Sequence, residues 1–309
     1  MFTKEKYTLP SSDGIHTLCG AAYIPRAEIR MLLCISHGMI EHIGRYDAFM
    51  QYLAQNGILA FGHDHIGHGL SVCEGEMPGH LPRKTGLDTL VNDVLADLAM
   101  WKQKYPELPL VLLGHSMGSF IARLAAARDK TALCDGLIVM GTGALNPLAV
   151  PGLLIEGLIA KCFGETHISK FADDLAFGSY NDRFEKRTSN DWLSRDASII
   201  DIKEADPLAN YKFTIAGMYT VTRLNKESNA KKTFEDTRKD IPLLVISGAE
   251  DPVGDYGKGV KAVYEGYRAA GVKDTACIMY DGARHEVLNE INREEVYADL
   301  LAWLFEHIK

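Results

Sequence analysis

Short apolar runs alternate with segments of helical periodicity along most of this chain. The apolar runs are almost uninterrupted and rich in Val, Ile and Leu, which is typical of strands covered on both faces in a parallel sheet. Helices in the intervening segments would supply the covering layers. We therefore predict an α/β fold with strands over residues 30–36, 58–63, 108–113, 136–140, 241–247 and 275–280.

The segments between these runs carry apolar residues at helical spacing. The clearest example covers about 87–105, where Leu90, Val94 and Leu98 recur on one face before a proline ends the pattern. Further helices are predicted over 46–55, 119–128 and 295–307 and from about residue 256, with an antiparallel edge hairpin over 4–9 and 17–23.

The alternation stops between about residues 146 and 240, where helical and loop material contains no convincing strand. A long insertion of this kind is usually a functional lid, so we predict a helical cap at 146–240 within a body formed by 1–145 and 241–309. Near its start the cap is strongly apolar. Four residues there could line an acyl pocket, touch a membrane surface or simply pack the cap on the body: Leu153, Leu154, Leu158 and Ile159.

Composition restricts the partners and the compartment. The 309 residues carry a net charge of -8 and no long basic run, whereas nucleic-acid binding needs clustered Lys and Arg, so no nucleic-acid partner is expected. The six cysteines are scattered without a C-x-x-C pair and are interpreted as reduced. The N-terminal residues lack the apolar core of a signal peptide, and no run of about twenty apolar residues occurs. We therefore expect a cytoplasmic protein.

The pentapeptide Gly114-His115-Ser116-Met117-Gly118 follows a predicted strand and precedes a predicted helix. This is the context of a nucleophile elbow, a tight strand-to-helix turn that presents a serine hydroxyl. Glycines are needed two residues to either side because side chains there would collide across the turn. Ser116 is therefore the predicted nucleophile, and an ordinary Gly-Ser turn is the alternative.

A serine hydroxyl needs a general base, and that base needs an orienting carboxylate. Asp251 lies in the loop after one predicted strand, and His285 lies in the loop after the last. The chain order Ser, Asp, His is the order expected behind a nucleophile elbow. We therefore predict a triad of Ser116, Asp251 and His285, with Glu250 and Asp255 as alternatives for the acid.

Attack on a carbonyl produces an oxyanion, which two preorganised backbone N–H groups can stabilise. One expected donor is Met117, directly after the nucleophile. The other is expected in the loop after an early strand, where His37, Gly38 and Met39 lie. Met39 is therefore the second candidate donor.

Several stretches of the chain resemble the monoacylglycerol lipase and lysophospholipase group of serine α/β-hydrolases. They are the elbow, Gly248-Ala249-Glu250-Asp251, Gly282-Ala283-Arg284-His285, His37-Gly38-x-x-Glu41-His42-x-x-Arg45-Tyr46 and Asp64-His65-x-Gly67-His68-Gly69-x-Ser71. The resemblance implies an α/β-hydrolase fold with a mostly parallel central sheet, helices on both faces and a cap over an acyl pocket. It also implies an ester hydrolase that uses the predicted triad and oxyanion donors and no cofactor.

Two cap stretches look like bacterial relatives that are usually labelled lysophospholipases. They are Tyr180-Asn181-x-x-Phe184 and Asp191-Trp192-Leu193-Ser194-Arg195-Asp196. Monoacylglycerols or lysophospholipids are therefore the predicted substrates, and a small acyl ester, possibly a lipid, is the predicted partner.

A zinc hydrolase is one alternative, because the stretch His63-Asp64-His65-Ile66-Gly67-His68 has the histidine spacing of the dinuclear motif H-x-H-x-D-H. That motif needs an aspartate where Gly67 stands, and zinc chemistry would leave the serine elbow unexplained. No metal is therefore predicted.

A proline iminopeptidase is another alternative, because it would share the body and the elbow. It would need acidic cap residues to hold a substrate amino group, and Glu165, Asp173 and Asp174 are candidates. The apolar start of the cap favours esters. A non-catalytic interaction protein would have no reason to keep all the triad positions.

Overall fold

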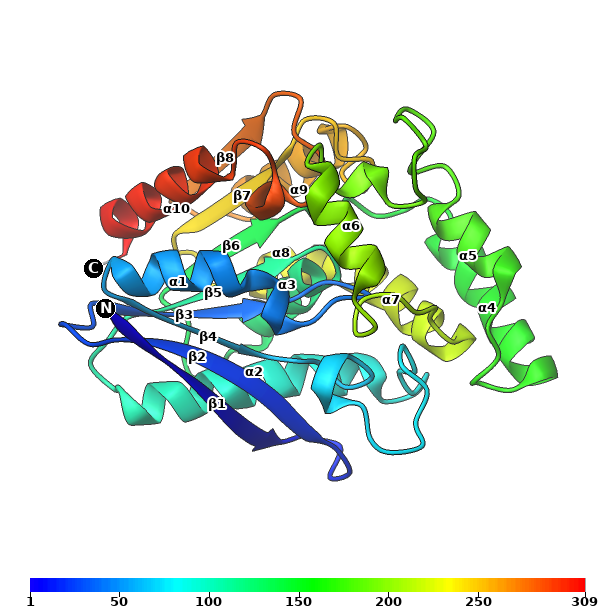
Figure 1. The fold of residues 1–309 in the computed structure, drawn as a ribbon, viewed down its shortest axis with the longest axis horizontal. Coiled ribbons are helices and arrows are strands. Elements are labelled where there is room, and N and C mark those ends of the chain that lie inside the picture. The colour runs from blue at the N-terminus through cyan, green and yellow to red at the C-terminus, as the bar shows by residue number, and fades with distance from the viewer. Residues whose placement is uncertain (309) are drawn as a thin grey trace.

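The computed structural model describes residues 1–308 and arranges them around one eight-stranded sheet (Figure 1). Its strands are β1 (Phe2–Pro10), β2 (Thr17–Pro25), β3 (Met31–Ser36), β4 (Ile58–His63), β5 (Leu110–His115), β6 (Gly136–Met140), β7 (Leu243–Gly248) and β8 (Thr275–Tyr280). The strand order is β1-β2-β4-β3-β5-β6-β7-β8. β2 is antiparallel to both β1 and β4, and all other neighbours are parallel.

Strands β3 to β7 are buried along their whole length. Successive side chains point to opposite faces of the sheet. Leu32 and Cys34 therefore join the apolar cluster on one face, while Leu33 and Ile35 join the cluster on the other. This two-sided burial is the physical reason that the strand segments are apolar without alternation. β8 lies at the sheet edge and is partly exposed.

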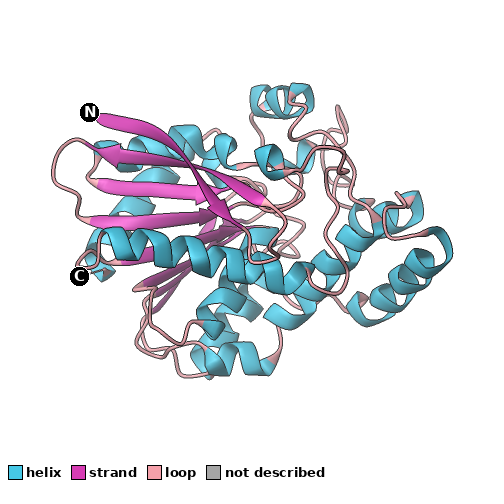
Figure 2. Ribbon diagram, turned by 90° about the horizontal axis from the view of Figure 1, so that it is seen from below, coloured by secondary structure: helices cyan, strands magenta, loops and turns pink. Residues whose placement is uncertain are grey.

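Helices cover both faces of the sheet (Figure 2). The helices α1 (Asp47–Gln55) and α10 (Arg293–His307) pack on the face that carries Leu33. The opposite face is covered by α2 (Gly86–Lys104), α3 (Met117–Arg128) and α9 (Lys258–Ala269). The predicted mostly parallel sheet with helices on both faces is confirmed.

Element ends differ slightly from the prediction. The helix expected from about residue 256 begins at Lys258, because Asp255, Tyr256 and Gly257 have φ values of 47°, 52° and 88°. A right-handed helix requires negative φ, so it cannot start before these residues. Their conformation places a tight turn directly after the loop that holds Asp251.

The segment between β6 and β7 is helical, and none of residues 141–242, all of which are described, forms a strand. α4 packs against α7, and α7 also packs against α2 and α3. α8 packs against α3 and α9 of the body. Among residues 1–308 no helix has the length and apolarity that crossing a bilayer requires. The helices of this segment are α4 (Ala149–Phe163), α5 (Lys170–Phe177), α6 (Ala197–Ala205), α7 (Ile215–Ser228) and α8 (Lys231–Asp236).

Candidate active site

Ser116 alone connects β5 to α3. Its backbone has φ 53° and ψ -120°, a conformation that non-glycine residues rarely adopt and that clusters at functional sites. A Cβ added to Gly114 would lie 2.2 Å from the carbonyl oxygen of Gly118, and a Cβ on Gly118 would lie 2.0 Å from that of Ser36. The two glycines are therefore required by the close approach of β3, β5 and α3, and the turn has the shape of a nucleophile elbow.

Asp251 and His285 form a buried pair. His285 Nδ1 lies 2.9 Å from Asp251 Oδ2, and both side chains are almost fully inaccessible. Asp251 also accepts hydrogen bonds from Ser247 Oγ (3.0 Å) and from the Val253 N–H (2.9 Å). A carboxylate on Nδ1–H leaves Nε2 available for proton exchange. The alternative acids, Glu250 and Asp255, are both exposed.

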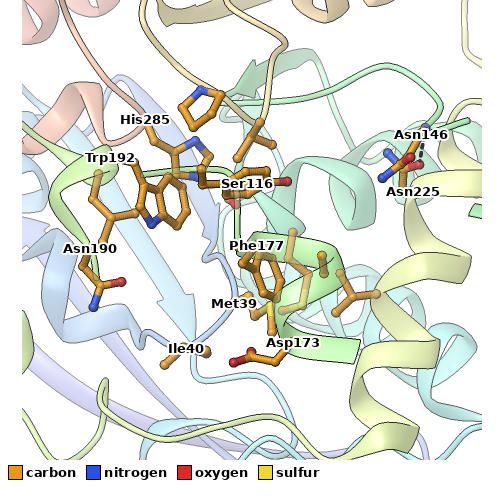
Figure 3. Close-up of a pocket in the computed structure, with 18 of the residues that line it drawn as sticks. Met39, Ile40, Ser116, Asn146, Asp173, Phe177, Asn190, Trp192, Asn225 and His285 are labelled. Carbon is orange, nitrogen blue, oxygen red and sulfur yellow. Dashed lines mark hydrogen bonds between the residues drawn. The ribbon is translucent and has the colours of Figure 1, made fainter. Parts of the chain in front are cut away.

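Ser116 and His285 face the same cavity (Figure 3). The Ser116 N–H donates to the Met140 carbonyl oxygen (3.0 Å), and a Cβ on the next residue, Gly141, would lie 3.1 Å from His285 Cε1. Both side chains line one cavity. Among residues 1–308 no hydrogen bond joins Ser116 to His285. Such bonds are often long before substrate binds and tighten in the Michaelis complex.

The Met39 and Met117 amides lie beside the predicted nucleophile. A Cβ on Gly38 would lie 3.0 Å from Ser116 Cβ, so the loop that carries Met39 packs directly on Ser116. Met117 is the first residue of α3, where the helix leaves N–H groups free. Within residues 1–308 neither amide donates to a protein acceptor. The two N–H groups are therefore free to donate to an oxyanion.

A buried carboxylate, Glu41, fixes this loop. It accepts hydrogen bonds from the Gly38 N–H, from Tyr46 Oη (2.8 Å) and from Arg45 Nη1 (3.2 Å). Arg45 also donates to both oxygens of Glu286, at 2.6 and 2.8 Å. Because Glu286 directly follows the predicted base, this network joins the predicted oxyanion loop to the histidine loop. Glu41, Arg45 and Tyr46 belong to a stretch of the resemblance, but the sequence did not indicate this role.

The charges in this network shift the pKa values of its members. Burial would raise the pKa of Glu41, but His115 and Arg45 hold that pKa well below its usual range. Burial would lower the pKa of His115, yet the Glu41 carboxylate raises it overall. Burial would also raise the pKa of Glu286, and Arg45 lowers it overall. The two carboxylates are therefore held ionised beside cationic partners.

A cavity of about 1040 Å³ opens over Ser116. This size is sufficient for a lipid-like ligand. Its lining combines apolar and polar side chains from α3, α5, α7 and the connecting loops: Met39, Phe120, Phe177, Met218, Val221, Asn146, Asn190 and Asn225. Figure 3 shows Met39, Phe177 and Trp192 around the predicted nucleophile.

None of the apolar cap residues predicted to bind substrate lines this cavity: Leu153, Leu154, Leu158 and Ile159. The Leu154 and Leu158 side chains are 67% and 62% exposed. The buried residues of α4 are mostly small, which lets the helix approach α7 closely, and its larger side chains face outward or sideways. A helix that is apolar all round does not reveal from its sequence which face is buried.

The histidines behind the zinc alternative are buried supports of the loop after β4. They use one ring nitrogen each to contact a nearby group: His63 Nδ1 to Asp97 (2.7 Å), His65 Nε2 to Ser36 (3.1 Å) and His68 Nδ1 to Ile66 O (2.9 Å). Burial lowers the pKa of His68 to about 3. In the described chain, residues 1–308, the one trio whose ligand atoms converge is His16, Cys73 and Glu76, and it includes none of the three.

Comparisons with known proteins agree with this architecture. The Hydrolase_4 family, described as serine aminopeptidase S33, matches residues 27–292. Monoglyceride lipase of Rattus norvegicus is 29% identical over 302 residues, covering 97% of this chain and 90% of the relative. A monoglyceride lipase homolog of Monkeypox virus is 31% identical and covers 91% of each chain.

A solved structure gives the same picture. A thermostable carboxyl esterase from Bacillus coagulans in complex with glycerol superposes with a TM-score of 0.89 at 26% identity, over 100% of both chains. The family match, the relatives and the shared fold lead to one assignment. The chain belongs to the Hydrolase_4 family of serine hydrolases, in the monoacylglycerol lipase group of α/β-hydrolases.

Proposed function

We propose that this serine hydrolase cleaves the ester bond of monoacylglycerols or lysophospholipids through an acyl-enzyme on Ser116. The observation that carries the proposal is the buried Asp251–His285 pair beside a serine in a strained turn, at the wall of a large and partly apolar cavity. The names of the relatives, monoglyceride lipases, support a lipid ester. We also propose that residues 146–240 act as the cap of this cavity.

In the first half of the reaction, Ser116 Oγ attacks the acyl carbon while its proton moves to His285 Nε2. The carbonyl electron pair moves onto oxygen, and the Met39 and Met117 N–H groups donate to that oxyanion. Asp251 stabilises the imidazolium that forms. Each oxyanion donor contributes on the order of 10²-fold to 10³-fold in rate. The tetrahedral intermediate then collapses, the ester C–O bond breaks, and the alcohol leaves with the proton from His285.

In the second half, water attacks the acyl carbon of the acyl-enzyme and gives one proton to His285 Nε2. The new tetrahedral intermediate collapses, and the bond between the acyl carbon and Ser116 Oγ breaks. His285 returns the proton to Ser116, and the fatty acid leaves. The protein ends the cycle in its starting protonation state.

The surroundings of the acidic cap residues favour an ester over a peptide substrate. A peptidase that binds a substrate amino group needs a carboxylate free to pair with it. Asp173 and Asp174 already pair with lysines, Lys212 at 2.7 Å and Lys170 at 2.6 Å. Glu165 lies 3.3 Å from an arginine nitrogen. Each candidate therefore has a cationic partner that a substrate amino group would have to displace.

Exposed apolar side chains on α4 and α5 support contact with a lipid surface. Leu154 and Leu158 are four residues apart on α4, and Phe171 and Leu175 repeat this spacing on α5. Both helices lie at the outer end of the molecule, away from both termini (Figure 1). Exposed apolar patches of this kind mark interaction sites. We propose transient contact with lipid aggregates through these helices, close to the cavity that Phe177 of α5 lines.

A substrate panel tests the proposed function. Aryl esters from acetyl to lauroyl, monoacylglycerols, lysophosphatidylcholine and aminoacyl-arylamides would be compared on the wild-type protein and on Ser116→Ala. We expect hydrolysis of lipid esters and a loss on the order of 10⁶-fold in Ser116→Ala, with an unchanged circular dichroism spectrum. Full activity of Ser116→Ala would overturn the proposal, and a preference for prolyl arylamides would reassign the enzyme as a peptidase.

A further inference from the structure

The cap contacts the loop that carries His285 mainly through residues 190–196, which we call the strap. Outside the strap, Glu185 accepts hydrogen bonds from Arg284 Nη2 (2.9 Å). The Glu286 N–H donates to the Leu193 carbonyl oxygen (2.7 Å), and the His285 N–H donates to that of Trp192 (3.4 Å). Ser194 Oγ donates to the carbonyl oxygen of Asn289, further along the same loop (2.9 Å). The backbone that positions the predicted base is therefore bonded to the cap.

An ion pair between partly exposed Arg195 and buried Glu290 links the strap to this loop. Glu290 is fully buried and accepts hydrogen bonds from Arg195 Nε (2.9 Å) and from the Arg284 N–H (2.8 Å). Arg284 Nη1 in turn donates to the Asp191 carbonyl oxygen in the strap (2.7 Å). Removing the cationic partner of a buried carboxylate destabilises the folded protein. We therefore expect the strap and the loop that carries His285 to keep a fixed position relative to each other.

The strap places an indole ring against the predicted base. The rings of Trp192 and His285 have centroids 5.0 Å apart and lie tilted by 41°, and Figure 3 shows them side by side. Tyr180 packs edge-on against the indole at 5.0 Å, and the backbone N–H of Trp192 donates to Asn181 Oδ1 (3.0 Å). The two cap stretches that resemble bacterial relatives thus converge on His285.

We propose that Trp192 is a positioning residue, which keeps the His285 imidazole in the orientation that directs Nε2 to Ser116. This inference rests on the proposed triad. Asp251 holds the ring at Nδ1, and two rings lie beside it, His115 of β5 at 4.8 Å and Trp192 of the strap at 5.0 Å. The indole is therefore the ring contact through which the strap restricts rotation of the imidazole. Misplacing a reacting group by about 1 Å can cost on the order of 10²-fold in rate. The cap therefore contributes to the chemical step in addition to covering the cavity.

The test compares Trp192→Leu with Trp192→Phe across aryl esters of increasing acyl length. Trp192→Leu removes the flat ring, and we expect kcat to fall by roughly 10-fold to 100-fold for every acyl length with little change in KM. Trp192→Phe keeps an aromatic ring at His285 and should restore most of kcat. A residue that only forms the cavity wall would instead change KM, and the change would depend on acyl length.

The chain offers matched controls for the indole contact with His285 and for the attachment of the strap. Trp303 stacks on His307 at 5.2 Å on α10, so Trp303→Leu removes a similar tryptophan–histidine contact outside the cavity lining and should leave kcat unchanged. Arg195→Gln loosens the strap without altering the indole and should lower kcat. Arg293→Gln breaks a partly exposed ion pair with Asp196 in the same strap (3.1 Å) and should leave kcat unchanged.

The outcomes separate this inference from the proposed function. Activity retained by Ser116→Ala in the same assay would overturn the proposed function and this inference with it. If Ser116→Ala is inactive while Trp192→Leu keeps its kcat or changes only KM, the positioning role is wrong and the proposed function stands. If Trp192→Leu does not fold, Arg195→Gln decides, because a normal kcat in that variant would overturn the role of the strap.

Discussion

Asp251 and Glu250 are adjacent in sequence but have opposite environments. Asp251 is fully buried and accepts hydrogen bonds from Ser247, Val253 and His285. Glu250 points to solvent. A carboxylate can orient an imidazole and stabilise its cation only from within hydrogen-bond reach. At the scale of single residues, this pair therefore isolates the effect of the orienting acid from the general effect of negative charge in the loop.

Asp251→Asn should lower kcat on the order of 10⁴-fold, because an amide in place of the carboxylate leaves His285 in the wrong tautomer. Glu250→Gln removes the same charge one position away and should leave kcat close to wild type. Steady-state kinetics on a short aryl ester, with circular dichroism to verify folding, would measure both. A larger loss in Glu250→Gln than in Asp251→Asn would show that the acid is assigned to the wrong residue.

At the scale of elements, the contact between α4 and α7 contains an acid whose pKa burial raises. Glu156 on α4 accepts a hydrogen bond from Thr222 Oγ1 on α7 (3.0 Å), whereas its second carboxyl oxygen is buried without a partner among residues 1–308. Burial raises the pKa of Glu156 to about 7, although the Thr222 hydrogen bond lowers it in part. We therefore predict that the packing of α4 on α7 depends on pH.

The sign of this dependence follows from linkage. The folded pKa of Glu156, about 7, lies above the ordinary value of 4.5, so its contribution to stability is greatest below pH 4.5 and is lost as the pH rises to about 7. The glutamine of Glu156→Gln cannot ionise. At pH 8 the free energy of unfolding of this variant should therefore be roughly 1–3 kcal/mol higher than that of the wild type. At pH 4 the two should be similar.

Urea unfolding at both pH values measures this difference. Glu107→Gln, on an exposed glutamate of the body, is the control and should follow the wild type at each pH. An unchanged pH dependence in Glu156→Gln would contradict the assignment of a raised pKa to this carboxyl group.

At the scale of the whole molecule, the sequence predicts those features that depend on the local pattern of residues. The buried strands are visible because two-sided burial removes polar residues from them, and the elbow is visible because Gly114 and Gly118 must be small. Asp251 and His285 are visible as candidates because functional groups gather at the carboxyl ends of parallel strands. Such features depend on neighbours in the chain or on one simple rule of topology.

Long-range pairing is not visible in the same way. Arg45 and Glu286 are 241 positions apart, and Arg195 and Glu290 are 95 apart, so nothing in the local sequence pairs them. From the sequence, Leu154 and Leu158 could line a pocket or lie on an outer surface. Only the packing of α4 on α7 shows that they lie on the surface. The fixed relation between cap and histidine loop is therefore a property of the assembled fold.

Covalent chemistry at Ser116 is the central step of the proposed function. The direct measurement is intact-protein and peptide mass spectrometry after reaction with a fluorophosphonate that carries an alkyl chain. We predict one adduct per chain, located on Ser116, absent in Ser116→Ala and formed far more slowly in His285→Gln. Labelling of another residue, or equal labelling of Ser116→Ala with ester hydrolysis intact, would contradict the account.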